Sequence, residues 1–193
     1  MNKGRLEAFS DGVLAIVITI MVLELRAPGG GELASLRPLA PVFESYVLSF
    51  VFLGIYWNNH HHMFQAVRQV NGRILWSNLY LLFWLSLVPF VTAWMGENHF
   101  AARPVALYGV VLLMAAIAYY ILSRALIRCH GQDSVLATAV GSDFKGRISI
   151  VFYVVAIVVS FWNRWAALGI YVFVAVMWLI PDRRIEKTLS ESR

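Results

Sequence analysis

The sequence predicts an all-α membrane protein with six transmembrane helices in each subunit, and three observations carry this prediction. Hydrophobic residues make up 60% of the 193-residue chain and charged residues only 14%, whereas soluble domains are roughly 45–50% apolar and about 25% charged. The apolar residues fall in runs of about 20, the length that a helix needs to cross a bilayer. Only short segments connect these runs, so we expect residues 1–193 to form a single six-helix transmembrane domain.

Charged residues, glycines and prolines bound the apolar runs and place the expected spans. Only Asn163 and Arg164 interrupt the run from Ile148 to Ile180. A single helix of that length would be about 50 Å long, well beyond a hydrocarbon core of about 30 Å, so we expect a hairpin here. The six spans are expected at about 6–26, 40–64, 73–96, 103–127, 146–163 and 165–181.

The cations are distributed unequally between the two sides of the expected bundle. If the N-terminus is cytoplasmic, only Arg26, Arg37, Arg103 and Arg164 lie outside. The inner side then carries Lys3, Arg5, Arg68, Arg73, Arg124, Arg128, Lys145, Arg147, Arg183, Arg184, Lys187 and Arg193. The positive-inside rule therefore predicts a multi-pass protein of the plasma membrane with both termini cytoplasmic. This topology and contact with the lipid bilayer explain the formal net charge of +5, and no motif indicates a nucleic-acid partner.

The first span has two chemically different sides. Its sequence from Phe9 to Leu25, FSDGVLAIVITIMVLEL, contains a single threonine within the apolar run. At 100° per residue a stripe follows one side of the helix, formed by Gly12, Ile16, Thr19 and Leu23 with Ile20 on its flank. Asp11 points about 140° away from Ile16, and Ser10 also points well away from the stripe. The acid and the stripe must therefore face different neighbours.

Asp11 requires a partner, because an ionisable group within a span is costly unless it faces protein, water or another charge. Three candidates lie at a similar depth: Arg5 in the same helix, His60 in WNNHHHMF and Asn78 in WSNLYLLF. One interpretation is a polar clamp that fixes the tilt and rotation of the first helix. The other is a set of separate residues that meet lipid headgroups. Spacing alone does not separate them.

The three consecutive histidines, His60, His61 and His62, do not form a metal site. Consecutive helical residues diverge by about 100°, so the three rings cannot converge on one ion. We expect one histidine to face the bundle and the others to lie at the wet interface. Ser10, Asp11 and a histidine also lack the nucleophile elbow and oxyanion loop of a hydrolase. We therefore expect no enzyme activity, no metal and no cofactor.

These residues resemble a known family, the lysosomal potassium channel transmembrane protein 175 and its bacterial relatives. The most specific element is RLEAFSD, of the form R-x-x-x-F-S-D, at the head of the first span. W-x-x-H-x-x-x-F from Trp57 to Phe64 supports it, as does Asn78 eleven residues before Pro89 and Phe90. The six-span layout agrees over nearly the whole chain. The eukaryotic members carry two six-span repeats, so this chain is similar to the bacterial, single-repeat form.

The resemblance implies a potassium channel, with K⁺ as the permeant ion, in which four chains form a homotetramer and the first helices line a central pore. Its constriction corresponds to Ile16, with a threonine layer at Thr19 and further pore-lining residues at Ile20 and Leu23. The resemblance also implies that the R-x-x-x-F-S-D residues pack with a histidine of the second span and an asparagine of the third. This structural network corresponds to Arg5, Phe9, Ser10, Asp11, His60 and Asn78.

The expected mechanism is a hydrophobic gate. A ring of Ile16 would dewet when tight and pass largely hydrated monovalent cations when wider, while Thr19 hydroxyls supply oxygen ligands. Spacing alone equally allows Thr19 to bond a carbonyl of its own helix, and proton permeation is a secondary expectation from the family. The alternative function is a small proton-coupled transporter that uses Asp11 and His60 as a relay. Transporters of that type usually contain paired internal repeats, and none is evident here.

Overall fold

The structure is a computed structural model that describes residues 2–131, 134, 137 and 144–179. All regular elements in these ranges are helices, which confirms the predicted all-α class. They are α1 (Lys3–Leu23), the 3-10 helix η1 (Leu33–Leu39), α2 (Ala40–Gln65), α3 (Gly72–Ser86), α4 (Val88–Glu97), α5 (Ala102–His130), α7 (Phe144–Val159) and α8 (Arg164–Leu179).

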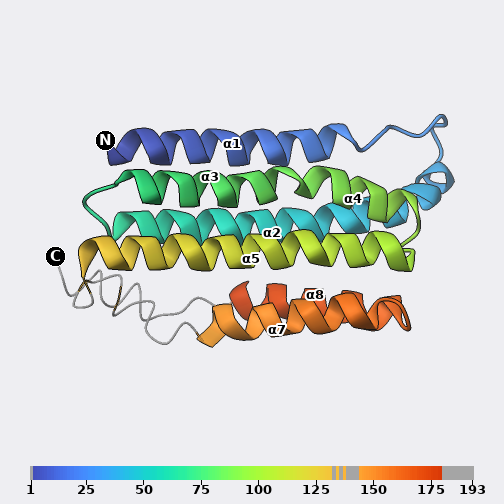
Figure 1. Cartoon of the computed structure of the whole chain (residues 1–193). Coiled ribbons are helices and arrows are strands. Elements are labelled where there is room, and N and C mark those ends of the chain that lie inside the picture. The colour runs from blue at the N-terminus through green and yellow to red at the C-terminus, as the bar shows by residue number, and fades with distance from the viewer. Residues whose placement is uncertain (1, 132–133, 135–136, 138–143, 180–193) are drawn as a thin grey trace.

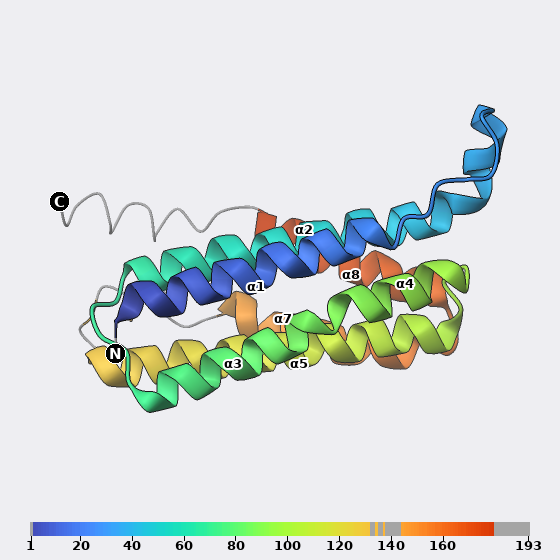
Figure 2. The same cartoon turned by 90° about the horizontal axis from the view of Figure 1, so that it is seen from above.

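The helices lie roughly side by side along one direction, with α2 to α5 in the middle of the molecule (Figures 1 and 2). Helix α1 packs against α2, α3 and α4. The α7–α8 hairpin packs against α5 and α2 on the opposite side from α1 (Figure 1). This order leaves one side of α1 without a neighbour among the described residues.

Four helical stretches of the described chain are long and apolar enough to cross a membrane. They are α1, η1 with α2, α3 with α4, and α5. Helices α7 and α8 have 16 residues each within the described ranges, which corresponds to about 24 Å at 1.5 Å per residue. The expected spans thus correspond to α1, α2, α3 with α4, α5, α7 and α8. Residues 180 and 181 of the last expected span lie outside the described residues.

The sequence predicts the third span as one continuous helix, but the structure divides it into two. Helix α3 ends at Ser86 and α4 begins at Val88, with Leu87 between them. Pro89 has no N–H to donate to the carbonyl of Leu85, and its ring disfavours a helical conformation in the residue before it. The span therefore bends at a position that the proline fixes.

Two glycines set the spacing between helices in the middle of the molecule. A Cβ atom at Gly96 would lie 2.7 Å from the Val42 Cα and 2.5 Å from the Ser45 Oγ, so α4 approaches the α2 backbone directly. A Cβ atom at Gly109 would collide with the Tyr171 hydroxyl of α8. The Tyr171 O–H donates to the Val105 carbonyl at 3.2 Å, which holds the ring in this place. Larger residues at either position would force these helices apart.

The first helix of the α7–α8 pair is separated from the second by a capped turn. The Asn163 Oδ1 accepts hydrogen bonds from the backbone N–H groups of Trp165 and Ala166, both at 3.1 Å. These are the donors that an N-cap side chain satisfies at the start of a helix. Asn163 and Arg164 thus mark the turn of the expected hairpin.

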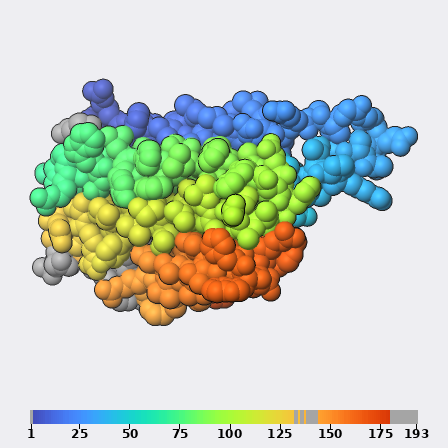
Figure 3. All heavy atoms as spheres, turned by 45° about the vertical axis from the view of Figure 1, so that its right-hand side comes forward, coloured from blue at the N-terminus to red at the C-terminus, as the bar shows by residue number. Residues whose placement is uncertain are grey.

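The connection between α1 and α2 extends beyond the end of the bundle (Figures 2 and 3). It contains η1, whose Leu33 is 84% exposed. At the other end of the molecule, the connection between α2 and α3 is fastened to the end of α5 by His130. The His130 Nε2 accepts hydrogen bonds from the backbone N–H groups of Arg68 and Gln69 at 3.1 and 3.2 Å.

The helix ends that carry the predicted inner cations lie together. The N-terminus of α1, the α2–α3 connection and the C-terminal end of α5 are at one end of the bundle (Figure 1). Arg68 and Arg73 belong to that connection or border it, and Arg128 lies in the last turn of α5. Four of the twelve predicted inner cations, Arg183, Arg184, Lys187 and Arg193, lie outside the described residues.

Candidate functional site

Helix α1 has one buried face and one exposed face. The buried face follows spacings of three and four residues and contains Leu6, Ser10, Leu14, Val17 and Met21. These residues pack against α2, α3 and α4. The exposed face carries the residues that the sequence predicts to line a pore.

A chain of three hydrogen bonds fixes the buried face of α1 to α2 and α3. The His60 Nε2 is 2.8 Å from the Asn78 Oδ1, and the Asn78 Nδ2 donates to the Ser10 Oγ at 2.9 Å. The Ser10 hydroxyl in turn donates to the Leu6 carbonyl at 2.9 Å. Ser10 and Asn78 are fully buried and His60 is 2% exposed, so each of these groups depends on its protein partner.

The direction of this chain follows from its last member. The Ser10 hydroxyl has one hydrogen, which goes to the Leu6 carbonyl, so its oxygen can only accept from Asn78. The amide NH₂ of Asn78 must therefore face Ser10 and its carbonyl oxygen must face His60. His60 then donates through Nε2–H. These hydrogen bonds therefore fix the orientations of the three side chains relative to one another, and the series ends on the Leu6 carbonyl.

Asp11 has a different partner from the three that the sequence suggested. Its Oδ1 accepts a hydrogen bond from the Trp57 Nε1 at 3.1 Å. The indole also stacks on the His61 ring, with ring centroids 6.0 Å apart. Both Asp11 and Trp57 are exposed, so this contact lies at the rim of the α1–α2 interface. Trp57 was not among the three expected partners, because these were chosen for charge or amide chemistry and an indole N–H donor was not considered.

The two remaining members of the predicted network, Arg5 and Phe9, do not join it within one chain. Both are exposed, and no hydrogen bond or ring contact connects them to His60 or Asn78. At 100° per residue each lies within about 20° of Ile16. They therefore extend the exposed stripe toward the N-terminus, and their predicted role stays a prediction.

The exposed stripe of α1 has a regular spacing. Its members alternate steps of four and three residues, with Ile20 beside them: Arg5, Phe9, Gly12, Ile16, Thr19 and Leu23. The side chains of Ile16 and Leu23 are 61% and 73% exposed, and those of Phe9 and Ile20 are 52% and 42% exposed. This spacing is the one that lets several helices meet along a common seam. None of the described residues covers this stripe.

Thr19 is the one hydroxyl on this stripe, and its hydrogen is already committed. The Thr19 Oγ1 donates to the Ala15 carbonyl at 2.8 Å. Because the hydrogen points back along the helix, the oxygen presents lone pairs to the exposed side. The bond to its own helix and a role as an outward-facing oxygen ligand are therefore compatible.

The histidine cluster separates as the divergence of consecutive residues requires. His60 faces the bundle, while the His61 Nε2 lies 2.8 Å from the Gln65 Nε2 at the exposed side of α2. No group of three potential metal ligands occurs among the described residues. The histidines thus form part of the packing of α1 and α2.

Comparison with known proteins places this arrangement in a family. Residues 5–89, which contain most of α1, all of α2 and α3 and the start of α4, match the family described as "Endosomal/lysosomal potassium channel TMEM175". A potassium channel of Chryseobacterium sp. (strain P1-3) is 60% identical over 192 residues, covering 100% of both chains. The chain belongs to the TMEM175 family. The similarity to this relative covers the entire chain, including the α7–α8 hairpin.

A solved structure of the TMEM175 family shares the fold. The crystal structure of a lysosomal potassium-selective channel TMEM175 homolog from Chamaesiphon minutus matches with a TM-score of 0.79 at 30% identity, covering 92% of this chain and 96% of that one. The TMEM175 proteins of rat and human, named endosomal/lysosomal proton channels, are 32% identical over 116 residues, or 54% of this chain and 23% of theirs. This chain is therefore a multi-pass membrane protein of the TMEM175 family and not an enzyme.

A second buried polar cluster of this TMEM175 family member joins α2, α4 and α5. The Ser49 Oγ lies 2.6 Å from the Thr92 Oγ1 and 3.1 Å from the Tyr108 hydroxyl. The Thr92 hydroxyl also lies 2.7 Å from the Val88 carbonyl, near the bend between α3 and α4. The sequence analysis did not find this cluster. The signal was the spacing of Ser45, Ser49, Phe52 and Tyr56, a row on one side of α2 that is buried in the structure.

Proposed function

We propose that the chain is one subunit of a homotetrameric cation channel that conducts potassium through a pore lined by the exposed stripe of α1. The observation that carries the proposal is this stripe, which is exposed in the single chain and spaced for assembly around an axis. The family supports it, because the relatives from Chryseobacterium and Chamaesiphon are named potassium channels.

Symmetry turns the stripe from a lipid-compatible surface into the wall of a lumen. A bare ion in hydrocarbon costs tens of kcal/mol on an idealised Born estimate, so conduction needs a water-filled path. One helix cannot enclose water, whereas closed rotational symmetry brings copies of the same stripe around one axis. The helices α2, α3 and α4 pack on the other face of α1 and would form the outer support of this ring.

Ile16 is the proposed constriction. Its side chain projects from the middle of α1 and is 61% exposed. Four such side chains around an axis form an apolar ring that dewets when narrow and passes largely hydrated cations when wider. Leu23 lies about 10 Å further along the helix, since seven residues rise 1.5 Å each. It extends the apolar wall of the proposed pore toward the outer mouth.

In this proposal the channel distinguishes potassium from sodium only weakly, and it does so at the constriction. The chain contains no TVGYG segment, so backbone carbonyls of that kind do not replace the hydration shell. Thr19 lies about 4.5 Å along the helix from Ile16, and its oxygen lone pairs supply replacement ligands at that level. Potassium is hydrated less tightly than sodium and is favoured. Because the mammalian relatives are named proton channels, we include proton permeation in the proposal.

The proposed orientation places the N-terminus in the cytoplasm. The end of the bundle that contains it also contains Arg68, Arg73 and Arg128, whereas Arg103 and Arg164 begin helices at the opposite end. The positive-inside rule then puts the N-terminal end and, with an even number of spans, the C-terminus on the cytoplasmic side of the cell membrane.

The geometry weighs against the alternative of a proton-coupled transporter. A relay between Asp11 and His60 requires a hydrogen-bonded path, but Asp11 bonds Trp57 and His60 bonds Asn78. The His60 chain ends on the Leu6 carbonyl, and an asparagine amide is not a proton carrier. The same residues are well suited to hold α1 in place.

Ion flux through purified protein tests the proposed constriction. Ile16→Asn is expected to raise potassium flux into liposomes about tenfold or more, because lowering a barrier by 1.4 kcal/mol raises a rate tenfold. Val172→Asn is the matched control, since Val172 is 47% exposed on α8, away from α1, and is expected to leave the flux unchanged. An unchanged flux in Ile16→Asn would exclude Ile16 as the constriction.

The mass of the particle tests the assembly independently of conduction. Four chains of 21.8 kDa give a protein mass of about 87 kDa. A monomer in detergent and in nanodiscs, together with saturable and coupled uptake, would favour the transporter instead.

A further inference from the structure

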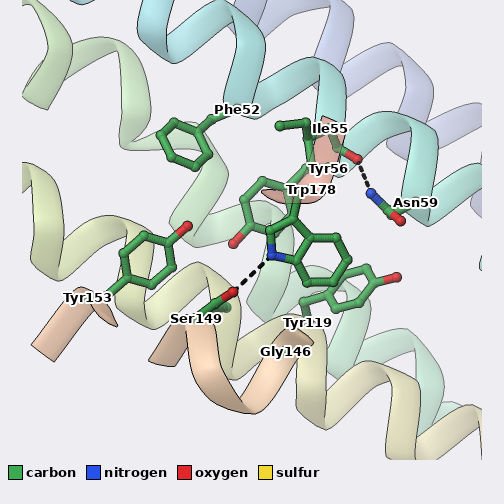
Figure 4. Close-up of a pocket in the computed structure, with 10 residues that line it drawn as sticks. Phe52, Ile55, Tyr56, Asn59, Tyr119, Gly146, Ser149, Tyr153 and Trp178 are labelled. Atoms are coloured by element: carbon green, nitrogen blue, oxygen red, sulfur yellow. Dashed lines mark hydrogen bonds between the residues drawn. The ribbon is translucent and has the colours of Figure 1, made fainter. Parts of the chain in front are cut away.

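The hollow between α2, α5, α7 and α8 is too small to hold a ligand (Figure 4). Its cavity volume is about 30 Å³, and one water molecule needs about 10–15 Å³ on this measure. Trp178 is part of its wall and donates from its indole N–H to the Ser149 Oγ at 2.9 Å. Larger uncovered apolar surfaces lie on the outside of the described chain, and one of them is on η1.

Helix η1 exposes a row of leucines at the outer end of the bundle. A 3-10 helix has three residues per turn, so Leu33, Leu36 and Leu39 lie on one side of it and form a leucine row. Leu33 is 84% exposed and Leu36 is 49% exposed. The connection that carries them extends beyond the end of the bundle (Figures 2 and 3). The described residues thus leave most of the leucine row uncovered.

The acyl chains of the membrane do not cover the leucine row either. Glu44, in the second turn of α2, has an exposed side chain, and a charged side chain is costly in hydrocarbon. The acyl region therefore begins beyond Glu44 along α2. Helix η1 ends at Leu39, before α2 begins at Ala40, and Arg37 within η1 is also exposed and charged. The leucine row thus lies outside the acyl region, where a protein surface is the partner that can bury it.

The direction in which η1 projects indicates which protein surface it meets. The exposed stripe of α1 faces away from α2, α3 and α4, so an axis beside that stripe places the neighbouring chains on the two flanks of the molecule. Figure 2 shows α2 along one side of α1 and α3 with α4 along the other, and η1 projects on the side of α2. In a closed ring the α2 flank of one chain meets the α3–α4 flank of the next. Helix η1 is therefore directed toward the α3–α4 flank of the neighbouring chain.

The exposed side of α4 offers a matching surface at the outer end of that flank. Phe90, Trp94 and Glu97 project from one side of α4, within about 60° of one another. The Phe90 and Trp94 rings stack with their centroids 6.5 Å apart, and Phe90 is 62% exposed. Glu97 is exposed, as Arg37 of η1 is. Neither charge has an ion-pair partner among the described residues.

We propose that η1 of each chain docks on the exposed side of α4 in the next chain of the tetramer. The leucine row covers Phe90 and Trp94 there. Arg37 pairs with Glu97 at the edge of the contact. Arg37 comes directly after Leu36, and Glu97 lies less than one turn after Trp94, so each surface has apolar side chains followed by one charge of opposite sign. Two different surfaces of one chain that match in this way form a head-to-tail contact, which repeats around a closed ring.

This docking contact rests on the proposed tetramer, and the mass of the particle separates the two proposals. A particle of about 87 kDa, four chains of 21.8 kDa, in which η1 does not contact α4 of another chain would overturn the docking contact alone. A monomer would overturn both proposals. Potassium flux is not needed for either measurement, so the docking contact is tested separately from conduction.

Cross-linking between chains tests the docking contact. Cys129, the single cysteine of the chain, is replaced by serine, and a tagged chain with Leu36→Cys is produced together with an untagged chain with Trp94→Cys. A short bismaleimide in lipid vesicles is expected to join the tagged chain to the untagged one. The link should be lost when Trp76→Cys replaces Trp94→Cys, because Trp76 is 75% exposed on the same flank but lies near the inner end of α3.

Three outcomes of this experiment would contradict the docking contact. They are the absence of a link to Trp94→Cys, equal yields at positions 94 and 76, and a stronger link between two Leu36→Cys chains than between the two different chains. The last result would show that η1 packs on its own copy around the axis.

A charge exchange tests the pairing of Arg37 with Glu97. Adding Arg37→Glu to the tagged chain should lower the yield of the link between positions 36 and 94 by about twofold or more, as expected for an exposed charge pair that becomes repulsive. Adding Glu97→Arg to the untagged chain as well should restore the yield. Equal yields from all three combinations, or no recovery in the doubly exchanged pair, would overturn the proposal.

Discussion

Replacing Asn78 with leucine removes the central member of the hydrogen-bond chain that holds α1 against α2 and α3. The His60 Nε2–H then loses its acceptor, and the Ser10 Oγ loses the bond that it accepts from the amide. Both groups are buried, with His60 2% exposed and Ser10 fully buried. Water therefore cannot replace Asn78 without opening the helix interface.

The expected loss of stability follows from these two groups. A buried donor left without a partner costs about 1–3 kcal/mol, and one lost hydrogen bond costs about 0.5–1.5 kcal/mol. The leucine fills a volume similar to that of the asparagine, so the cavity contribution is small. We expect Asn78→Leu to lower the free energy of unfolding by about 2–4 kcal/mol, mainly through the isolated imidazole.

Equilibrium unfolding in mixed micelles measures this change. Asn58→Leu is the matched control, because Asn58 is an exposed asparagine on α2 and its replacement leaves no buried group unpaired. A double-mutant cycle with Ser10→Ala should show a coupling of about 0.5–3 kcal/mol, since the two residues share a hydrogen bond. If Asn78→Leu matches the wild type, or if the two substitutions are additive, the chain does not hold α1 in place.

Three further substitutions test single contacts. Gly96→Ala is expected to destabilise the protein by about 1–3 kcal/mol in the same assay, because the new Cβ meets the α2 backbone at Val42, which cannot move alone. Asn163→Ala should lower the free energy of unfolding by about 1 kcal/mol through the lost cap of α8. Asn163→Asp should retain most of the stability of the wild type. Equal stability of all three proteins would contradict the capping role. Trp57→Phe should cost less than about 1 kcal/mol, because its bond to Asp11 is exposed, and a larger loss would contradict this exposed position of the contact.

The helices were predictable because their determinants are local. Composition and run length require spans of about 20 residues, and the turn at Asn163 follows from the length that a bilayer permits. The bend at Leu87 was missed, although Pro89 supplied the signal. A proline at this position is compatible with a bend within one helix and with the start of a new helix. Packing against α2 and α5 determines which of the two occurs.

The site was predictable in part for a similar reason. Helical geometry separates the stripe at Ile16 from Ser10 without knowledge of any neighbour, whereas the partner of Asp11 depends on the register between α1 and α2. Trp57 and His60 point about 60° apart on α2, so a rotation of that helix by about 60° would bring one of them to the direction that the other now has relative to α1. Sequence spacing within one helix does not contain that rotation.

The interhelical hydrogen bonds that the structure gives to α1 all lie in its N-terminal half, at Ser10 and Asp11. Beyond Asp11, apolar side chains such as Leu14, Val17 and Met21 hold the helix. The hydrogen bonds at Ser10 and Asp11 thus form a pivot near the N-terminal end of α1. A tilt of about 5° about Ser10 would displace Ile16 by about 0.8 Å and Leu23 by about 1.7 Å, at 1.5 Å rise per residue. If four first helices tilted together in the proposed tetramer, the width of the pore would change most near Leu23 and least near Ser10.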